Sequence, residues 1–508
     1  MKINTSNMKL NLNRGKVVEK NDRWIEQDII VPDNMPDAIK IINITSTPYI
    51  NDIEINEGRA KVVGKINYSV IYRSDDENSS VRGLNVSYPY TSSIENSNIS
   101  SKEDIEIDSS LKNIIFSLPN ERKIAVKNEL SFNMQIIKKT SVELIKEFKE
   151  DTDIECNKCE NTFNNIKENK KSIIASTEDV MLRKEATCIQ EILKTKCRIK
   201  DTEHKESYNK IMLKGILELE ILYMDEHNNI CCEKVDIPFS SIVELENISE
   251  RSQFFIKYCI RDVNIRVNPD IDQRTLNIDY KIENNVTVYE RECVEYINDF
   301  YSRSRDLKFE NRDVDVVANE YDVEREIKIT ETINDILPEN VRIVDYSVDM
   351  EAVRPMFENG SVKFSGNARV NMLLQNKETN ELENKSLEIM VDETFPIENS
   401  WGNSNINIRI EDIKIDITQN GMNIDIKIIV KLKVNVENIL QMNSMTNIED
   451  EPINLNNINS INIYIVKKGD SIWKIAKKYK TSMENIIKTN ALEDPNLIDI
   501  GQKIMIIR

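Results

Sequence analysis

Cysteine and histidine are the residue types in this chain that could hold a metal ion or act as a nucleophile. The 508 residues include eight cysteines and two histidines. Cys156 and Cys159 form a CxxC pair, but a zinc site needs a second pair or neighbouring histidines. His204 and His227 stand alone in charged or turn-like sequence. Free thiols in a reducing compartment are the simpler interpretation, so we expect no metal site.

Sequence motifs for catalysis are also missing. The chain has no phosphate loop of the GxxxxGK type, no GxGxxG, no GxSxG and no HExxH. Its 87 Asp and Glu residues make any acidic pair undiagnostic of glycoside hydrolysis. We therefore expect a protein that is not an enzyme, with no catalytic residues and no cofactor.

One aromatic residue near the C-terminus could anchor a ligand. Trp473 lies in the stretch "GDSIWKIAKKYK" and falls about 100° around a helix from Ile472, at the edge of the apolar face. A partly exposed tryptophan is typical of binding hot spots. Packing against the flank of its own domain is the alternative, and both remain open. Lys474, Lys477 and Lys478 mark the solvent side as a basic rim.

The elements that would position this tryptophan can be predicted from residues 461–508. Short apolar runs at each end, "IYIV" and "KIMII", predict two paired strands. Between them, an apolar stripe at helical spacing follows Asp470 or Ser471, either of which can cap a helix. A second helix is predicted to open with a capping box from Thr481 to Glu484 and to bury Ile486. The expected fold is a small βααβ domain.

The preceding chain contains a threefold internal repeat. The stretches "KVVGKINYSVIY", "IMLKGILELEILY" and "VKFSGNARVNMLL" align on Gly64, Gly215 and Gly366, which are spaced by 151 residues. Apolar residues alternate with polar ones after each glycine, as in half-buried strands. A polar turn and a second strand follow, and Asn420-Gly421 marks a later hairpin. The fold class is mainly β, with three β-rich repeats followed by the βααβ domain.

Composition shifts suggest the domain limits. Low apolar content marks residues 1–24 as a tail and residues 151–172, which contain the CxxC, and 441–460 as polar linkers. The three repeats then occupy residues 25–150, 173–305 and 306–440, with the small domain at 461–508.

Charge is distributed unevenly between these parts. The chain carries a formal net charge of −19, which argues against a nucleic-acid partner. Residues 461–508 contain nine Lys or Arg and five Asp or Glu, a net of +4, so the first 460 residues carry −23. The first 24 residues show no apolar signal region and no long apolar run occurs later, so we expect a cytoplasmic protein without a transmembrane segment.

Residues 461–508 resemble a LysM domain. This resemblance implies a groove for chitin-like or peptidoglycan glycans between two loops, Gly469-Asp470-Ser471-Ile472 and Asn496-Leu497-Ile498. A single shallow groove of this kind should bind sugar weakly. The positions that match the LysM pattern are Tyr464, Val466, Gly469, Asp470, Ser471, Ile475, Ala476, Tyr479, Ile486, Asn490, Leu492, Pro495, Leu497, Gly501, Gln502, Ile504 and Ile506.

The repeats over residues 25–440 resemble the SPOCS domain of spore-coat-associated proteins from endospore-forming bacteria. Together with one C-terminal LysM domain, they are similar to a family of clostridial coat-morphogenesis adaptors. That similarity implies a mother-cell protein at the forespore surface, whose LysM domain binds the coat ATPase known as stage IV sporulation protein A. A peptidoglycan or N-acetylglucosamine binder of cell wall or spore cortex is the alternative. Self-association of the β repeats through edge strands is compatible with the adaptor role.

Overall fold

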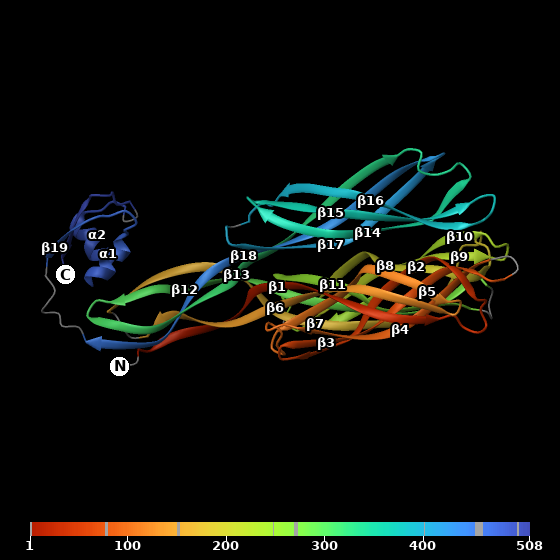
Figure 1. Ribbon diagram of the computed structural model, residues 1–508. Helices are drawn as coiled ribbons and strands as arrows, with labels where there is room; N and C mark the ends of the chain where they lie inside the picture. The colour runs from red at the N-terminus through yellow and green to blue at the C-terminus, as the bar shows by residue number, and fades with distance from the viewer. Residues whose placement is uncertain are drawn as a thin grey trace.

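The computed structural model describes residues 3–76, 80–149, 153–246, 248–268, 273–400, 402–452, 461–494 and 497–507. Within these ranges, each repeat consists of six strands in two three-stranded antiparallel sheets. The second, third and fourth strands form a meander, while the long first and sixth strands pair with each other and the fifth pairs with the sixth. The sheets stack into a β-sandwich, which confirms the predicted fold class (Figure 1).

The strands of the three repeats follow one another in the same order. The first repeat contains β1 (Thr5–Ile30), β2 (Ala38–Asn56), β3 (Arg59–Ser74), β4 (Val81–Glu95), β5 (Asp104–Asn120) and β6 (Lys123–Phe148). The second contains β7 (Ile154–Met181), β8 (Ile189–Ser207), β9 (Lys210–Asp225), β10 (Ile230–Glu244), β11 (Ser252–Val267) and β12 (Thr275–Ser302). The third contains β13 (Arg305–Ile333), β14 (Val341–Glu358), β15 (Ser361–Asn376), β16 (Leu382–Pro396), β17 (Ser404–Asn420) and β18 (Asn423–Pro452).

The alternating apolar residues after each repeat glycine form the sandwich cores. In the first repeat, Ile66, Tyr68 and Val70 of β3 pack against the apolar face of β6, including Val126 and Phe132. A strand places every second side chain on one face, so this alternation turns the whole apolar set inward. The equivalent positions in the other repeats are also buried: Leu217, Leu219, Ile221 and Tyr223 in β9, and Ala368, Val370, Met372 and Leu374 in β15.

The repeats are arranged around a pseudo-threefold axis. β4 contacts β8, β10 contacts β14, and β16 contacts β2, so the three meanders close into a ring. Ile71, Leu222 and Leu373 occupy equivalent positions 151 residues apart and belong to one buried cluster. A single chain thereby forms, from its three repeats, the kind of central core that a homotrimer would form from three separate chains.

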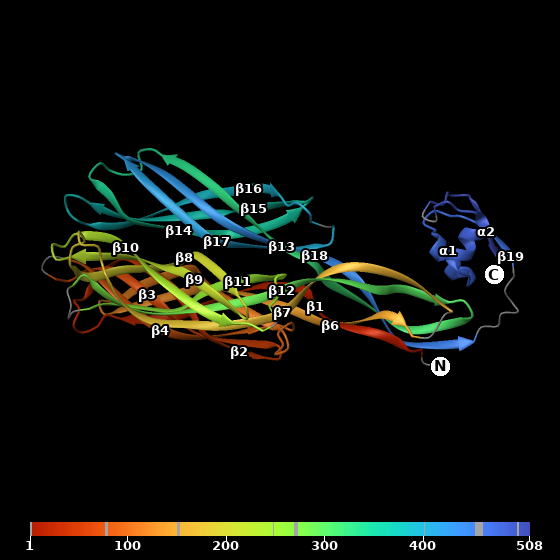
Figure 2. The same cartoon turned by 180° about the vertical axis from the view of Figure 1, so that it is seen from behind.

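Away from the sandwiches, the long strands continue as three two-stranded arms. Each arm joins the first half of β1, β7 or β13 to the last half of β6, β12 or β18. Leu12, Phe163 and Val314, again 151 residues apart, meet in a shared apolar cluster and hold the arms together. The arms extend from the sandwiches toward the C-terminal domain (Figures 1 and 2).

The arms contradict the prediction of a tail and two linkers. Residues 5–24, 154–172 and 441–452 of these three segments lie within β1, β7 and β18. Their outward faces are polar, and their inward residues become buried only against the other two arms, which lie far away in the sequence. Local composition therefore gave the wrong interpretation, and the exact domain limits stay predictions.

Candidate binding site

The C-terminal domain has the predicted βααβ order. β19 (Ile461–Ile465) pairs with β20 (Lys503–Ile507), and α1 (Ile472–Tyr479) and α2 (Met483–Asn490) lie between them in sequence. The inward residues of β20 and the apolar stripes of both helices form its core. The fully buried members of this core are Ile472, Ile475, Ala476, Ile486, Ile504 and Ile506.

Helix α1 is fixed by the loop before it. Ser471 is its N-cap, and its hydroxyl accepts a hydrogen bond of 3.2 Å from the backbone N–H of Lys474. Asp470 instead accepts bonds of 2.8 Å from the Lys467 backbone N–H and the Tyr464 hydroxyl. The backbone bond from Lys467, followed by that from Tyr464, lowers the pKa of Asp470. Asp470 therefore shapes the loop.

The predicted capping box of α2 is wrong. Ser482 is the N-cap, and its hydroxyl accepts from the backbone N–H of Asn485 at 3.2 Å. Thr481 lies one residue earlier and is buried, with its own hydroxyl donating to the Ile507 carbonyl at 3.3 Å. The N-cap of α2 lies one residue later than predicted because the Thr481 side chain is hydrogen-bonded to the sheet.

The residues expected to line the ligand groove divide into exposed and buried ones. Gly469 is exposed and has a φ of +86°, which favours glycine. Leu497 is 76% exposed, whereas Ile498 packs partly against the domain core and Ile472 is buried within it. Asn496 lies outside the described residues. Among the residues predicted to line a groove, Leu497 is therefore the apolar one that faces solvent.

Trp473 is half-buried, and it contacts a different part of the same chain. Its indole N–H donates a 2.7 Å hydrogen bond to the Asp299 carboxylate of β12. Its ring meets Tyr301 edge-on, with ring centroids 5.0 Å apart. Lys477, one helical turn further along α1, forms an ion pair with the same Asp299 carboxylate. Trp473 therefore joins its own domain to the tip of the second arm, a contact that neither interpretation included, and its role as a ligand anchor stays a prediction.

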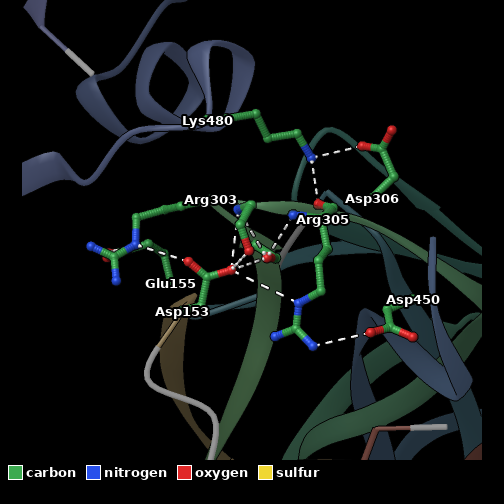
Figure 3. Close-up of polar contacts among 9 residues, drawn as sticks. Asp153, Glu155, Arg303, Arg305, Asp306, Asp450 and Lys480 are labelled. Atoms are coloured by element: carbon green, nitrogen blue, oxygen red, sulfur yellow. Dashed lines mark hydrogen bonds and ion pairs between the residues drawn. The ribbon is translucent and has the colours of Figure 1, made fainter. Parts of the chain in front are cut away.

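Three further contacts complete this docking surface, shown in part in Figure 3. The Tyr301 hydroxyl donates a 2.7 Å hydrogen bond to the Thr481 carbonyl, and burial raises the pKa of Tyr301. Lys480 pairs with Asp306 at 2.9 Å and donates to the Arg305 carbonyl at 3.3 Å. We call Asp299, Tyr301, Arg305 and Asp306, at the tip of the second and third arms, the seat.

The predicted basic rim is divided by this docking. Lys477 faces the seat, while Lys474 and Lys478 are exposed. Lys474 donates to the Gly469 carbonyl at 2.8 Å, and Lys478 lies over the rings of Tyr464 and Tyr479 at 5.0 and 5.6 Å. A lysine-rich surface beside the groove loops therefore stays open to solvent.

Sequence reasoning missed the seat. Its residues fall in "NDFYSRSRD", at the expected boundary between the second and third repeats. The available signal was a pair of carboxylates, Asp299 and Asp306, on either side of Tyr301. In an acidic body that carries a basic domain, such a pair could have indicated a docking surface.

The eight cysteines and two histidines all lie within the described residues. Each of the eight cysteines is a free thiol, and burial raises the pKa of Cys156 to about 11. Cys156 and Cys159 lie on β7 and pack into two different apolar clusters. His204 and His227 are exposed. Across the described ranges, no group of three or more His, Cys, Asp or Glu side chains is placed to hold a metal ion.

The described chain consists of β-sandwich repeats joined to a small C-terminal βααβ domain. Comparison with protein families identifies both parts. The family model "SipL, SPOCS domain" matches residues 37–118 and 188–268, and the LysM domain model matches residues 464–506. The chain thus contains two SipL-type SPOCS domains, spanning β2–β5 and β8–β11, and one C-terminal LysM domain. The third repeat shares their strand order.

Curated relatives match over 42 to 46 residues, about the length of the LysM domain. The spore coat assembly protein ExsA of Bacillus cereus is 51% identical over 45 residues, which cover 9% of this chain and 7% of that protein. The SpoIVD-associated factor A of Bacillus subtilis (strain 168) is 51% identical over 45 residues, or 9% of this chain and 12% of the relative. The secreted LysM effector ECP6 of Passalora fulva is 46% identical over 43 residues, 8% and 19% of the two chains. The chain spans less than a fifth of these relatives, and no solved structure matches it.

Neither described helix has the length and apolar content needed to cross a bilayer.

Proposed function

We propose that this protein is a non-enzymatic adaptor of spore-coat assembly, which acts in the mother cell at the forespore surface. Its LysM domain binds a coat morphogenetic protein, an ATPase of the stage IV sporulation protein A type. The observation that carries the proposal is the combination of SipL-type SPOCS domains and a LysM domain with matches of 45 residues, at 51% identity, to a spore coat assembly protein and to SpoIVD-associated factor A.

The charge distribution supports a protein ligand. The LysM domain has a net charge of +4, and Lys474 and Lys478 remain exposed while Lys477 and Lys480 are engaged by the seat. Exposed lysines attract an acidic partner and raise the association rate more than the final affinity. The closed body of three repeats supplies a rigid base that presents this surface.

A second candidate is a glycan binder of the cell wall or spore cortex. Leu497 and Gly469 leave the groove loops exposed, and the secreted LysM effector shares this domain. A groove of this size buries little ligand area, so the affinity of one copy for a short glycan should be low.

Binding of the full chain to purified stage IV sporulation protein A and to sedimented peptidoglycan distinguishes the two. The variants are Leu497→Arg in the groove and a chain that ends at residue 452. Ile173→Arg, which changes an exposed apolar residue of β7, is the matched control. Protein binding that is lost on truncation and unaffected by Ile173→Arg supports the adaptor. Peptidoglycan binding that Leu497→Arg abolishes, without protein binding, supports the glycan binder instead.

A further inference from the structure

The contact between the LysM domain and the arm tip joins complementary groups. One carboxylate, Asp299, receives both the indole N–H of Trp473 and the ammonium group of Lys477. Tyr301 is buried within the same apolar cluster as the LysM core residues Ile472 and Ile475. The contact therefore pairs groups of complementary polarity and charge around a shared apolar cluster.

The seat is held in place from below (Figure 3). Asp153, at the start of the second arm, accepts hydrogen bonds from Ser302 and from the backbone N–H and hydroxyl of Ser304. Arg303 pairs with Asp153 at 3.5 Å, and Arg305 reaches Asp450 at 3.1 Å. These contacts tie together β7, β12, β13 and β18 around the turn that carries the seat, so the docking surface is preorganised.

We propose that the seat is a latch, which holds the LysM domain closed and covers the Trp473 face of α1 until it is released. Closed, α1 presents Trp473 and Lys477 to the arm tip, and a ligand that uses this face must compete with the seat. The groove loop at Gly469 and the side chain of Leu497 stay exposed in the closed state. The latch therefore gates one face of the LysM domain and leaves the other open.

The interactions that close the latch are of a kind that can open again. In the pair of Lys477 and Asp299 the side chains are 41% and 31% exposed, and in the pair of Lys480 and Asp306 they are 21% and 62% exposed. Ion pairs with this exposure are weak and are screened by salt. Burial of Tyr301 and its edge-on contact with Trp473 supply the apolar part. High salt should therefore loosen the closed state and leave both domains folded.

Quenching of Trp473 fluorescence by acrylamide measures the latch without any ligand. The chain has three tryptophans, so the parent protein carries Trp24→Phe and Trp401→Phe and retains Trp473. Acrylamide is uncharged, and its access to the indole therefore reports coverage and not charge. We expect weak quenching at low salt and stronger quenching as sodium chloride is raised.

Two kinds of variant test the seat residues. Tyr301→Ala removes the apolar contact and should raise quenching at low salt to the level of the opened protein. Lys480→Asp and Asp306→Lys should each shift the ratio of open to closed molecules by about two- to fivefold, and the double exchange should restore the parent value. Lys480 has a φ of +53°, a conformation that Asp tolerates. Lys468→Asp removes an exposed lysine outside the seat and should leave quenching unchanged.

The latch is overturned if Trp473 in the parent protein is quenched at low salt as strongly as in Tyr301→Ala. It is also overturned if the double charge exchange opens the protein as much as the single variants do. Circular dichroism on every variant separates opening from unfolding, because an opened latch leaves the β signal intact. These outcomes do not depend on which ligand the LysM domain binds.

Discussion

Gly64 of β3 lies directly opposite Tyr90 of β4, and the tyrosine ring covers the glycine. The two residues are register partners, and a Cβ at position 64 would come within 2.7 Å of the ring. It would also overlap the backbone carbonyl oxygen of Tyr49 on the other neighbouring strand, β2. The second repeat places Gly215 opposite Phe239 in the same way. In two of the three repeats, an aromatic ring on the next strand therefore explains why the repeat motif begins with a glycine.

Gly64→Ala should therefore destabilise the first repeat by about 1 to 3 kcal/mol, as overpacking against backbone does. Gly402→Ala is the matched control, since a Cβ there meets no atom within 4 Å. Urea denaturation followed by circular dichroism compares the two. Equal stability of both variants would mean that the strands can move apart at Gly64 at little cost.

A buried ionic cluster links the first repeat to the third. Lys16 of β1 pairs with Glu320 of β13 and lies 3.8 Å from Glu437 of β18, whose side chain is fully buried. Removing one partner of a buried ion pair leaves an uncompensated charge. Lys16→Met should cost about 3 to 5 kcal/mol of unfolding free energy at pH 7. The measurement is again urea denaturation.

The pH dependence of this variant gives a second test. Desolvation raises the pKa of Glu437, and Lys16 opposes the rise. A carboxyl whose folded pKa lies above its unfolded value binds its proton more tightly when folded, so the folded state gains stability as pH falls through the folded pKa. Without Lys16 the pKa rises further. The difference in unfolding free energy between the parent protein and Lys16→Met should therefore shrink between pH 7 and pH 5. A difference that stays constant would contradict a buried, charged Glu437.

The sequence predicted the repeats because their signal is local. Gly64, Gly215 and Gly366 recur with one spacing, and the strands after them alternate strictly. The helices of the LysM domain could also be predicted from local sequence. The N-cap of α2 is Ser482 and not the predicted Thr481, because Thr481 contacts the sheet.

The arms and the seat could not be predicted in this way. Leu12 and Phe163 stand in polar sequence, and each is buried by residues from arms more than a hundred positions away. Trp473 had two open interpretations because its partner, Asp299, is separated from it by 174 residues. Burial that depends on such distant segments leaves no local pattern of hydrophobicity.

Asp470 should stabilise the LysM domain through its ionised form. Its pKa is lowered by the bonds from the Lys467 backbone and Tyr464, so its contribution is present above the unfolded pKa and is lost as pH falls through the folded one. Asp470→Ala should lower the unfolding midpoint of the domain at pH 7. The difference from the parent should vanish in strong acid. Thermal melts at both pH values check this, and a difference that persists in acid would mean that the carboxylate has no such role.

The pseudo-threefold core makes a last prediction about cooperativity. Leu222 is buried where its equivalents Ile71 and Leu373 meet, so Leu222→Ala removes contacts with all three repeats at once. The expected cost is about 2 to 5 kcal/mol, as for other large cavities. Ile242→Ala, at an exposed position of β10 in the same sheet, should cost no more than about 0.5 kcal/mol. Because the ring is closed, Leu222→Ala should lower the midpoint of a single transition. A second transition confined to the middle repeat would show that the three sandwiches unfold independently.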